Sequence, residues 1–200
     1  MRSRRPPLHA LVPLLLCLSA APAVAHPHVF IDQGMLIRFE DGQPRSVRLS
    51  WTFDEVFSAA IAGEFDRDGD GSFSKAESAT IEKAAFVNLA SYGYFTSFVA
   101  GSRSVRATAY RDFVASLSAG RLTYEFSTDL PAPLAGATRP YGIRVYDDEF
   151  FVAFAVIAPE RIRLEGAPPG ARVEIEREAR GALSTAEYAP ARVVVVLEAP

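Results

Sequence analysis

Cysteine and histidine are scarce in this chain of 200 residues, and no long run of basic residues occurs. The one cysteine, Cys17, lies in an N-terminal segment that we expect to be removed, so the remaining chain has no thiol. This excludes disulfide bonds, catalysis by a thiolate and zinc sites built from cysteine. The formal net charge of −3 argues against binding to nucleic acid or to an anionic membrane surface.

The N-terminal segment has the pattern of a secretory signal peptide. Three arginines near its start precede an apolar stretch over residues 11–18, and the small residues at 23–25 form a typical cleavage site. The apolar stretch is shorter than the roughly 20 residues that a membrane-spanning helix needs. We therefore predict a signal peptide over residues 1–25 and a single periplasmic domain over residues 26–200.

The hydrophobic pattern of that domain is mainly that of β-strands. Residues 29–39 and the alternating stretch 46–53 flank Asp41-Gly42, which predicts a β-hairpin. After Tyr94, short stretches rich in β-branched and aromatic residues are separated by Gly, Pro or Asp clusters: FTSFVAG, SVRATAY, RLTYEFS, YGIRVYD, FFVAFAVI, ARVEIERE and ARVVVVLE. Regularly spaced short strands favour an antiparallel sandwich or barrel.

Two helical stretches interrupt the strand pattern. Apolar residues recur at helical spacing from Phe53 to Ile61, and Thr52 followed by Glu55 predicts a capping box at the start of that helix. A second helical stretch runs from Lys75 to about Ser91. We expect an α+β fold, mainly an antiparallel β-sandwich with an inserted helix-loop-helix unit at about residues 53–91.

Residues 66–77 read DRDGDGSFSKAE, which is the pattern of an EF-hand calcium loop. Gly71 stands where such a loop turns sharply, in a conformation that glycine adopts at little cost. Four carboxylates packed closely repel one another unless a dication neutralises them. The expected calcium ligands are Asp66, Asp68, Asp70, the backbone carbonyl of Ser72, Ser74 directly or through water, and a bidentate Glu77.

A solvated acidic turn is the plainer alternative, because Asp and Gly are common in loops. The match at all six ligand positions, with a capping box expected from Ser74 and Glu77, favours calcium. EF-hands usually pair, and sensors expose a groove rich in methionine, whereas this chain has one such loop and two methionines. We therefore expect calcium to stabilise the structure rather than to signal.

The mature N-terminus is the second candidate site. Cleavage after Ala25 makes His26 the first residue, followed by Pro27 and His28, and amine and imidazole donors suit zinc, nickel, cobalt or copper. Two imidazoles leave the site incomplete, and histidines at an exposed terminus also bind metals adventitiously. The acidic residues that could complete the site are Asp147, Asp148 and Glu149, which the sequence alone does not rank.

The motifs HPHVFID, SWTFDEVFS, FDRDGDGSFSKAE and RVYDDEFFVAF, in this order, resemble a bacterial family of unknown function. That family is described as the periplasmic component of an uncharacterised ABC-type transport system. The resemblance implies an association with nickel/cobalt or zinc transporters and no catalytic activity. It maps the family's His-Pro-His start onto residues 26–28 and its calcium-like loop onto residues 66–77. Asp148 stands where the family typically has a proline.

These observations favour a non-enzymatic, periplasmic metal-binding accessory protein that is stabilised by calcium and presents a transition metal to a membrane transporter. The alternative is a calcium-stabilised protein-interaction module in which Phe150 and Phe151 contact a partner. An enzyme is disfavoured because no base and nucleophile are recognisable as a pair. The sequence leaves the oligomeric state open.

Overall fold

A computed structural model describes residues 27–131, 141–178 and 186–197, so His26 lies outside the described residues. The secondary-structure elements, in chain order, are β1 (Val29–Glu40), β2 (Gln43–Phe53), α1 (Glu55–Phe65), α2 (Lys75–Ala84), η1 (Phe86–Phe95), β3 (Thr96–Ala100), β4 (Arg103–Arg106), β5 (Arg111–Ser118), β6 (Arg121–Asp129), β7 (Tyr141–Val145), β8 (Val152–Phe154), η3 (Pro159–Arg161), β9 (Ile162–Glu165), β10 (Arg172–Arg177) and β11 (Ala191–Val196). None of the helices in these ranges is long and apolar enough to cross a membrane.

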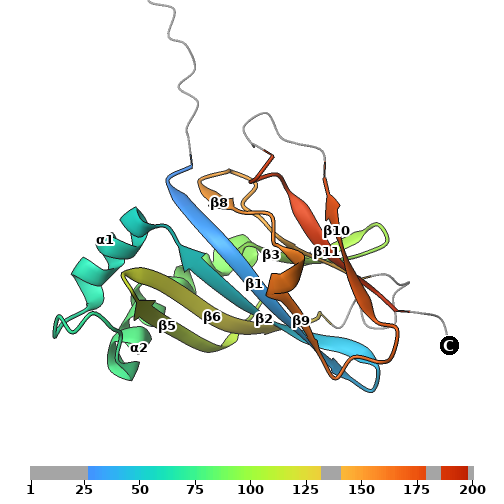
Figure 1. The fold of residues 1–200 in the computed structure, drawn as a ribbon, viewed down its shortest axis with the longest axis horizontal. Coiled ribbons are helices and arrows are strands. Elements are labelled where there is room, and N and C mark those ends of the chain that lie inside the picture. Colours follow the sequence, from blue (N-terminus) through green and yellow to red (C-terminus); the bar gives the residue numbers. More distant parts are fainter. Residues whose placement is uncertain (1–26, 132–140, 179–185, 198–200) are drawn as a thin grey trace, which may run out of the picture.

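The strands form two sheets, and the helices α1 and α2 lie at one end of the molecule (Figure 1). One sheet has the order β5-β6-β2-β1-β8, with β9 also paired to β1, and the other has the order β10-β11-β7-β3-β4. The mixed α+β, mostly β class predicted from the sequence is confirmed. The pairing is not wholly antiparallel, because β8 and β9 both run parallel to β1.

The β1–β2 hairpin is the centre of the first sheet. Its two-residue turn is Asp41-Gly42, whose φ values of 51° and 68° suit the twist of a tight hairpin. Alternate residues of both strands are buried, among them Ile37, Leu49 and Trp51. The hairpin predicted from the sequence therefore forms, with one face turned to the core.

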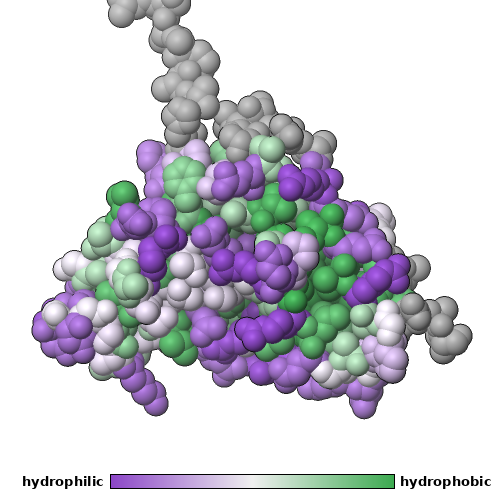
Figure 2. Space-filling view, viewed as in Figure 1, coloured by the Kyte–Doolittle hydropathy of each residue, from purple (hydrophilic) through white to green (hydrophobic). Residues whose placement is uncertain are grey.

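The two sheets share one core that is rich in aromatic rings. The ring of Trp51 lies 4.8 Å from that of Phe126 and 5.2 Å from that of Phe154 in its own sheet. Phe98 and Ile143 of the second sheet belong to the same buried cluster. Figure 2 shows hydrophobic residues between polar ones over the half of the molecule that holds β9, β10 and β11, whereas the end with α1 and α2 is more polar.

The first helix is not capped as the sequence predicted. Its N-cap is Asp54, whose Oδ1 accepts a hydrogen bond from the backbone N–H of Phe57 at 2.9 Å. Thr52 instead continues β2, where its hydroxyl lies 3.1 Å from that of Thr123 on β6. The capping box of Thr52 and Glu55 was therefore wrong, because strand pairing extends to Phe53 and leaves no room for an earlier helix start.

The second helix is shorter than predicted. It ends at Ala84, and the chain continues as the 3₁₀ segment η1, in which Gly93 and Tyr94 have positive φ. Phe86 at the start of η1 is fully buried, with its ring 4.8 Å from that of Phe126 and 5.5 Å from that of Tyr94. This packing against the sheet favours the change of helix type over a continued α-helix.

The strand predictions missed β5 and β9 and overestimated β8. β5 is an edge strand in which the apolar residues Phe113, Val114 and Ala115 are consecutive, and β9 has four residues, so neither has a strong alternating pattern. The stretch predicted as one strand from residue 150 to 157 pairs only from Val152 to Phe154. Phe150 is buried in a turn with φ of 54°, and Phe151 is 55% exposed.

Two buried serines hold the helices against the edge of the first sheet. The hydroxyl of Ser58 on α1 accepts a hydrogen bond from the backbone N–H of Leu122 at 3.0 Å. The hydroxyl of Ser78 on α2 accepts one from the backbone N–H of Ala115 at 2.8 Å. Each serine satisfies an amide that would otherwise be buried without a partner. The helical pair is thus docked on β5 and β6 through polar contacts as well as apolar ones.

The Ser78→Ala variant is expected to lose about 1–3 kcal/mol of unfolding free energy, because the amide of Ala115 then remains buried and unsatisfied. Urea denaturation of the two proteins measures this. The matched control is Ser104→Ala, since Ser104 is exposed on β4. Equal stability of the two variants would contradict a docking role for Ser78.

Candidate functional site

The segment between α1 and α2 is the first candidate site. Asp66 is the C-cap residue of α1, and its N–H bonds to the carbonyl of Ala62 at 3.0 Å. Ser74 is the N-cap residue of α2. The residues from 66 to 74 therefore form a loop whose two ends are fixed by helices, and the helices are fixed to the sheet.

Three aspartates of this loop lie close together. One carboxylate oxygen from each of Asp66, Asp68 and Asp70 lies within 4.8 Å of the others. Backbone N–H groups of the loop hold them there: Asp66 accepts from Gly69 at 2.9 Å and from Gly71 at 3.0 Å. Asp70 accepts from the N–H and hydroxyl of Ser72 at 2.8 and 2.7 Å. Both glycines have positive φ, so the backbone turns as glycine allows.

The cluster has no positive partner among the described residues. The ion pairs between described residues join other groups, and none includes Asp66, Asp68 or Asp70. Neighbouring carboxylates of like charge repel one another. A hard dication that accepts oxygen ligands would relieve this repulsion.

Glu77, the last predicted ligand, does not lie in the aspartate cluster. Its Oε2 accepts from the N–H of Ser74 at 2.9 Å, and the Ser74 hydroxyl accepts from the N–H of Glu77 at 3.3 Å. The capping box predicted for these two residues is therefore confirmed. The other carboxylate oxygen of Glu77, Oε1, accepts from the N–H of Arg67 at 2.6 Å. Hydrogen bonds from Ser74 and then from Arg67 lower the pKa of Glu77.

His28, the described half of the second candidate site, is exposed next to the turn that precedes β8. Its backbone N–H donates to the carbonyl of Phe151 at 3.0 Å, and the two rings lie 5.0 Å apart. The described residues place no two acidic or histidine side chains within ligand distance of His28. His26 lies outside the described residues, so the pair remains a prediction from the sequence.

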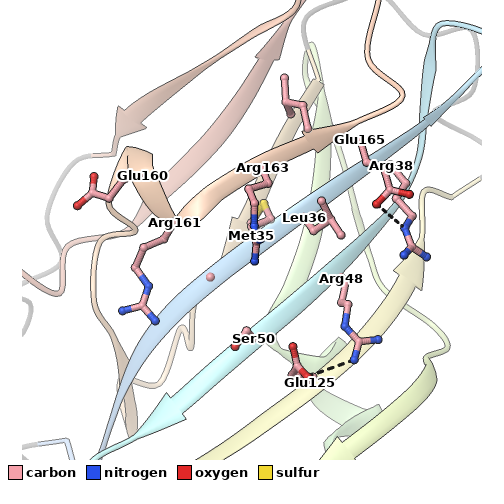
Figure 3. Close-up of a pocket in the computed structure, with 12 residues that line it drawn as sticks. Met35, Leu36, Arg38, Arg48, Ser50, Glu125, Glu160, Arg161, Arg163 and Glu165 are labelled. Atoms are coloured by element: carbon pink, nitrogen blue, oxygen red, sulfur yellow. Dashed lines mark hydrogen bonds and ion pairs between the residues drawn. The ribbon is translucent and has the colours of Figure 1, made fainter.

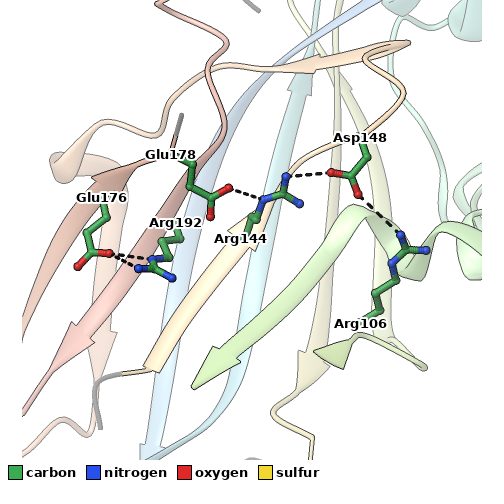
Figure 4. Close-up of polar contacts among 6 residues, drawn as sticks. All are labelled: Arg106, Arg144, Asp148, Glu176, Glu178 and Arg192. Atoms are coloured by element: carbon green, nitrogen blue, oxygen red, sulfur yellow. Dashed lines mark hydrogen bonds and ion pairs between the residues drawn. The ribbon is translucent and has the colours of Figure 1, made fainter. Parts of the chain in front are cut away.

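The acidic residues considered as further ligands have structural partners. Asp147 is buried and accepts from the N–H groups of Glu149, Phe151 and Val152 at 2.9–3.0 Å. Asp148 pairs with Arg144 at 2.9 Å and with Arg106 at 3.7 Å (Figure 4). Asp147 therefore shapes the turn that His28 contacts, and Asp148 belongs to a network of ion pairs. The side chain of Glu149 makes no hydrogen bond or ion pair among the described residues.

Sequence reasoning missed a hollow of about 870 Å³ on the outer face of the first sheet. Figure 3 shows the arginines that line it, among which Arg38 pairs with Glu165 and Arg48 with Glu125. The remaining arginines of the hollow are Arg161 and Arg163. They come from η3 and β9, elements that the hydrophobic pattern did not predict, so no sequence signal brings these residues together.

Comparison with known proteins gives the family. The model of the family described as "Protein of unknown function (DUF1007)" matches residues 11–189. The chain belongs to the DUF1007 family. The resemblance noted from the sequence is thereby confirmed as far as membership of a family of unknown function. The matched residues include the loop at 66–77 and the His-Pro-His segment.

One curated relative of this DUF1007 protein is an uncharacterised 15.5 kDa protein of Spirochaeta aurantia, encoded in the trpE 3′ region. It is 36% identical over 88 residues, which are 44% of this chain and 62% of the relative. The chain therefore spans about three fifths of that relative's length. The relative carries no assigned activity, so the site must be interpreted from its own geometry.

The lowered pKa of Glu77 predicts how its contribution to stability depends on pH in calcium-free buffer. The folded state favours ionised Glu77, so its contribution is complete above the ordinary pKa of 4.5 and is lost as the pH falls through the lowered value. The difference in unfolding free energy between the unchanged protein and Glu77→Gln should be constant from about pH 7 to 5 and shrink below that. Denaturant titrations from pH 7 to pH 3 measure it. A free-energy difference between the two proteins that grows as the pH falls would contradict this prediction. The matched control is Glu64→Gln, because Glu64 is exposed.

Proposed function

We propose that this protein is a non-enzymatic, metal-binding accessory protein of the bacterial periplasm. In this proposal calcium binds the EF-hand-like loop and stabilises the helical pair, while His26 and His28 capture zinc, nickel, cobalt or copper for a membrane transporter. The observation that carries the calcium part is the convergence of the Asp66, Asp68 and Asp70 carboxylates without a positive partner among the described residues. Oxygen ligands at these spacings suit calcium.

The arrangement of Glu77 suggests how calcium would complete the site. A bidentate ligand at this position must turn its two oxygens toward the three aspartates. Glu77 now accepts hydrogen bonds from the amides of Arg67 and Ser74, at the two ends of the loop. In this proposal a modest rotation lets the Glu77 side chain bind the metal, and Glu77 also caps the start of α2. Metal binding is thereby coupled to α2, which Ser78 holds against the sheet.

The transition-metal part has narrower support. The contact between His28 and the carbonyl of Phe151 fixes the chain one residue beyond Pro27. His26 would supply its amine and ring as a chelating pair. With Asp147 and Asp148 engaged elsewhere, Glu149 is the acidic side chain of this turn left for a metal or a partner. The resemblance to periplasmic components of transport systems supplies the expectation of a membrane transporter.

The exposure of Phe151 favours the alternative, a calcium-stabilised interaction module without a transition metal. Phe150, which was considered with it, is 5% exposed and belongs to the turn rather than to a surface patch. Purification from membranes with and without calcium separates the two proposals. A transporter that co-elutes only with the metal-loaded protein favours the accessory role.

Calcium is expected to raise the melting temperature, because it binds the folded state preferentially. A hundredfold excess over the dissociation constant adds about 2.7 kcal/mol of stability. Glu77→Gln should lose most of this calcium-dependent increment, whereas Glu64→Gln, with an exposed carboxylate just outside the loop, should retain it. Scanning calorimetry of each protein in calcium and in chelator measures the increment. The loss of the capping box in Glu77→Gln lowers stability in both conditions, so it cancels from the difference between them. Identical melting curves in calcium and in chelator would refute the stabilising role.

Transition-metal binding is tested by titration calorimetry with zinc, nickel, cobalt and copper on protein processed after Ala25. His26→Ala and His28→Ala should each weaken binding at least about tenfold, since each removes an imidazole donor. The unprocessed precursor is the matched control, because its His26 has no free α-amine and should bind more weakly. An affinity that neither substitution changes would overturn this part of the proposal and leave the calcium part standing.

A further inference from the structure

A cavity of about 460 Å³ lies between the β1–β2 hairpin, η1 and the turn before β8. We refer to it as the aromatic groove, and we define it by its floor of Trp51, Phe53, Phe86 and Tyr124 and its rim of Tyr92 and Phe151. Its volume lies within the range of about 300–1,000 Å³ that is typical of small-molecule sites. Neither the loop at 66–77 nor His28 lines it.

The aromatic groove has a rigid floor and an open rim. Phe86 and Trp51 are 0% and 1% exposed, so the floor is part of the packed core. Tyr92 and Phe151 on the rim are 46% and 55% exposed. The ring of Phe53 stacks on that of Phe57 at 4.9 Å, which extends the wall toward α1. A concave apolar surface joined to exposed aromatic side chains is typical of a binding site.

The charges at the aromatic groove are all negative. Asp147 and Glu149 are the charged residues among those that line it, and no arginine, lysine or histidine is present in that lining. Three backbone N–H groups fix the carboxylate of Asp147 beside the groove. The side chain of Glu149 has no hydrogen bond or ion pair among the described residues. The groove therefore combines aromatic faces with two carboxylates.

A smaller hollow of about 270 Å³ lies beside the groove, shares Asp147 and Glu149 with it, and is also lined by Arg106 and Arg144. The positive groups of these two arginines are already paired. Arg144 binds Asp148 at 2.9 Å and Glu178 at 3.1 Å, and it stacks over the ring of Tyr146. Arg106 pairs with Asp148 at 3.7 Å. Figure 4 shows these pairs side by side with that of Glu176 and Arg192 across the second sheet. Neither Arg106 nor Arg144 pairs with Asp147 or Glu149. Among the described residues, Asp147 is therefore held by backbone N–H groups alone, and Glu149 has no ion-pair partner.

We propose that the aromatic groove binds a small organic cation, namely an ammonium group attached to an apolar body. The electron-rich faces of Trp, Tyr and Phe attract such cations, most strongly where water is excluded. Asp147 and Glu149 supply the opposite charge, and the buried floor accepts the apolar body. An anionic ligand would face the two carboxylates without a positive partner in the groove.

Trp51 is the one tryptophan of the chain and lies in the groove floor, so its fluorescence reports binding directly. The probes are phenethylammonium, the neutral 2-phenylethanol of nearly equal shape, and anionic phenylacetate, added to protein expressed from the full coding sequence in calcium-containing buffer. Phenethylammonium should change the emission saturably and bind about tenfold more tightly than 2-phenylethanol. Equal affinity for the charged and neutral probes, or tighter binding of phenylacetate, would overturn the proposal.

Two substitutions locate the site. Glu149→Gln should weaken phenethylammonium binding several-fold and leave 2-phenylethanol unchanged, because it removes charge and retains shape. Phe151→Ala, at an exposed rim position, should weaken both probes. Glu160→Gln is the control, since Glu160 lines the separate hollow of Figure 3. An equal loss in Glu149→Gln and Glu160→Gln would mean that the probe senses only overall charge, and it would refute the proposal.

A second copy of the chain is the competing occupant. Repeating the titration at tenfold higher protein concentration distinguishes it. An unchanged dissociation constant supports a free groove that binds the organic cation. A dissociation constant that rises with protein concentration would show that self-association covers the groove, and the proposal would fail.

Discussion

The arrangement of the helical end depends on the carboxylate of Asp54. Its Oδ2 accepts a hydrogen bond from the backbone N–H of Phe30 at 2.8 Å, and its Oδ1 accepts one from that of Phe57 at 2.9 Å. The backbone N–H of Asp54 also donates to the carbonyl of Phe30 at 2.9 Å. One residue thus joins the start of β1, the end of β2 and the first turn of α1. The direction of α1 follows from the hairpin, which is itself the centre of the first sheet.

The candidate calcium loop lies between two helices that are fixed on the first sheet. Ser58 holds α1 against β6 and Ser78 holds α2 against β5, so both ends of the loop are fixed in space. The loop must then gather Asp66, Asp68 and Asp70 within a few ångströms of one another. That convergence costs electrostatic free energy, and a bound dication offsets the cost. Calcium in this account stabilises the junction between helices and sheet, which also forms one side of the aromatic groove.

Local patterns in the sequence predicted the features that local chemistry determines. The Asp41-Gly42 turn, the Ser74–Glu77 capping box and most strands follow from short-range signals. The N-cap at Asp54 was missed because the Thr52–Glu55 pattern is equally good locally, and only the pairing of Thr52 with Thr123 decides against it. The aromatic groove could not be predicted. Its walls come from distant segments, among them Trp51, Phe86 and Phe151, which the fold alone brings together.

Amide hydrogen exchange, followed residue by residue with and without calcium, tests the central claim most directly. If calcium bound at 66–77 stabilises the docking of both helices, protection should increase in α1 and α2. It should also increase at the amides of Ala115 and Leu122, which bond to Ser78 and Ser58. The strands of the second sheet, β10 and β11, should change little. Exchange rates at Ala115 and Leu122 that calcium leaves unchanged would contradict the account.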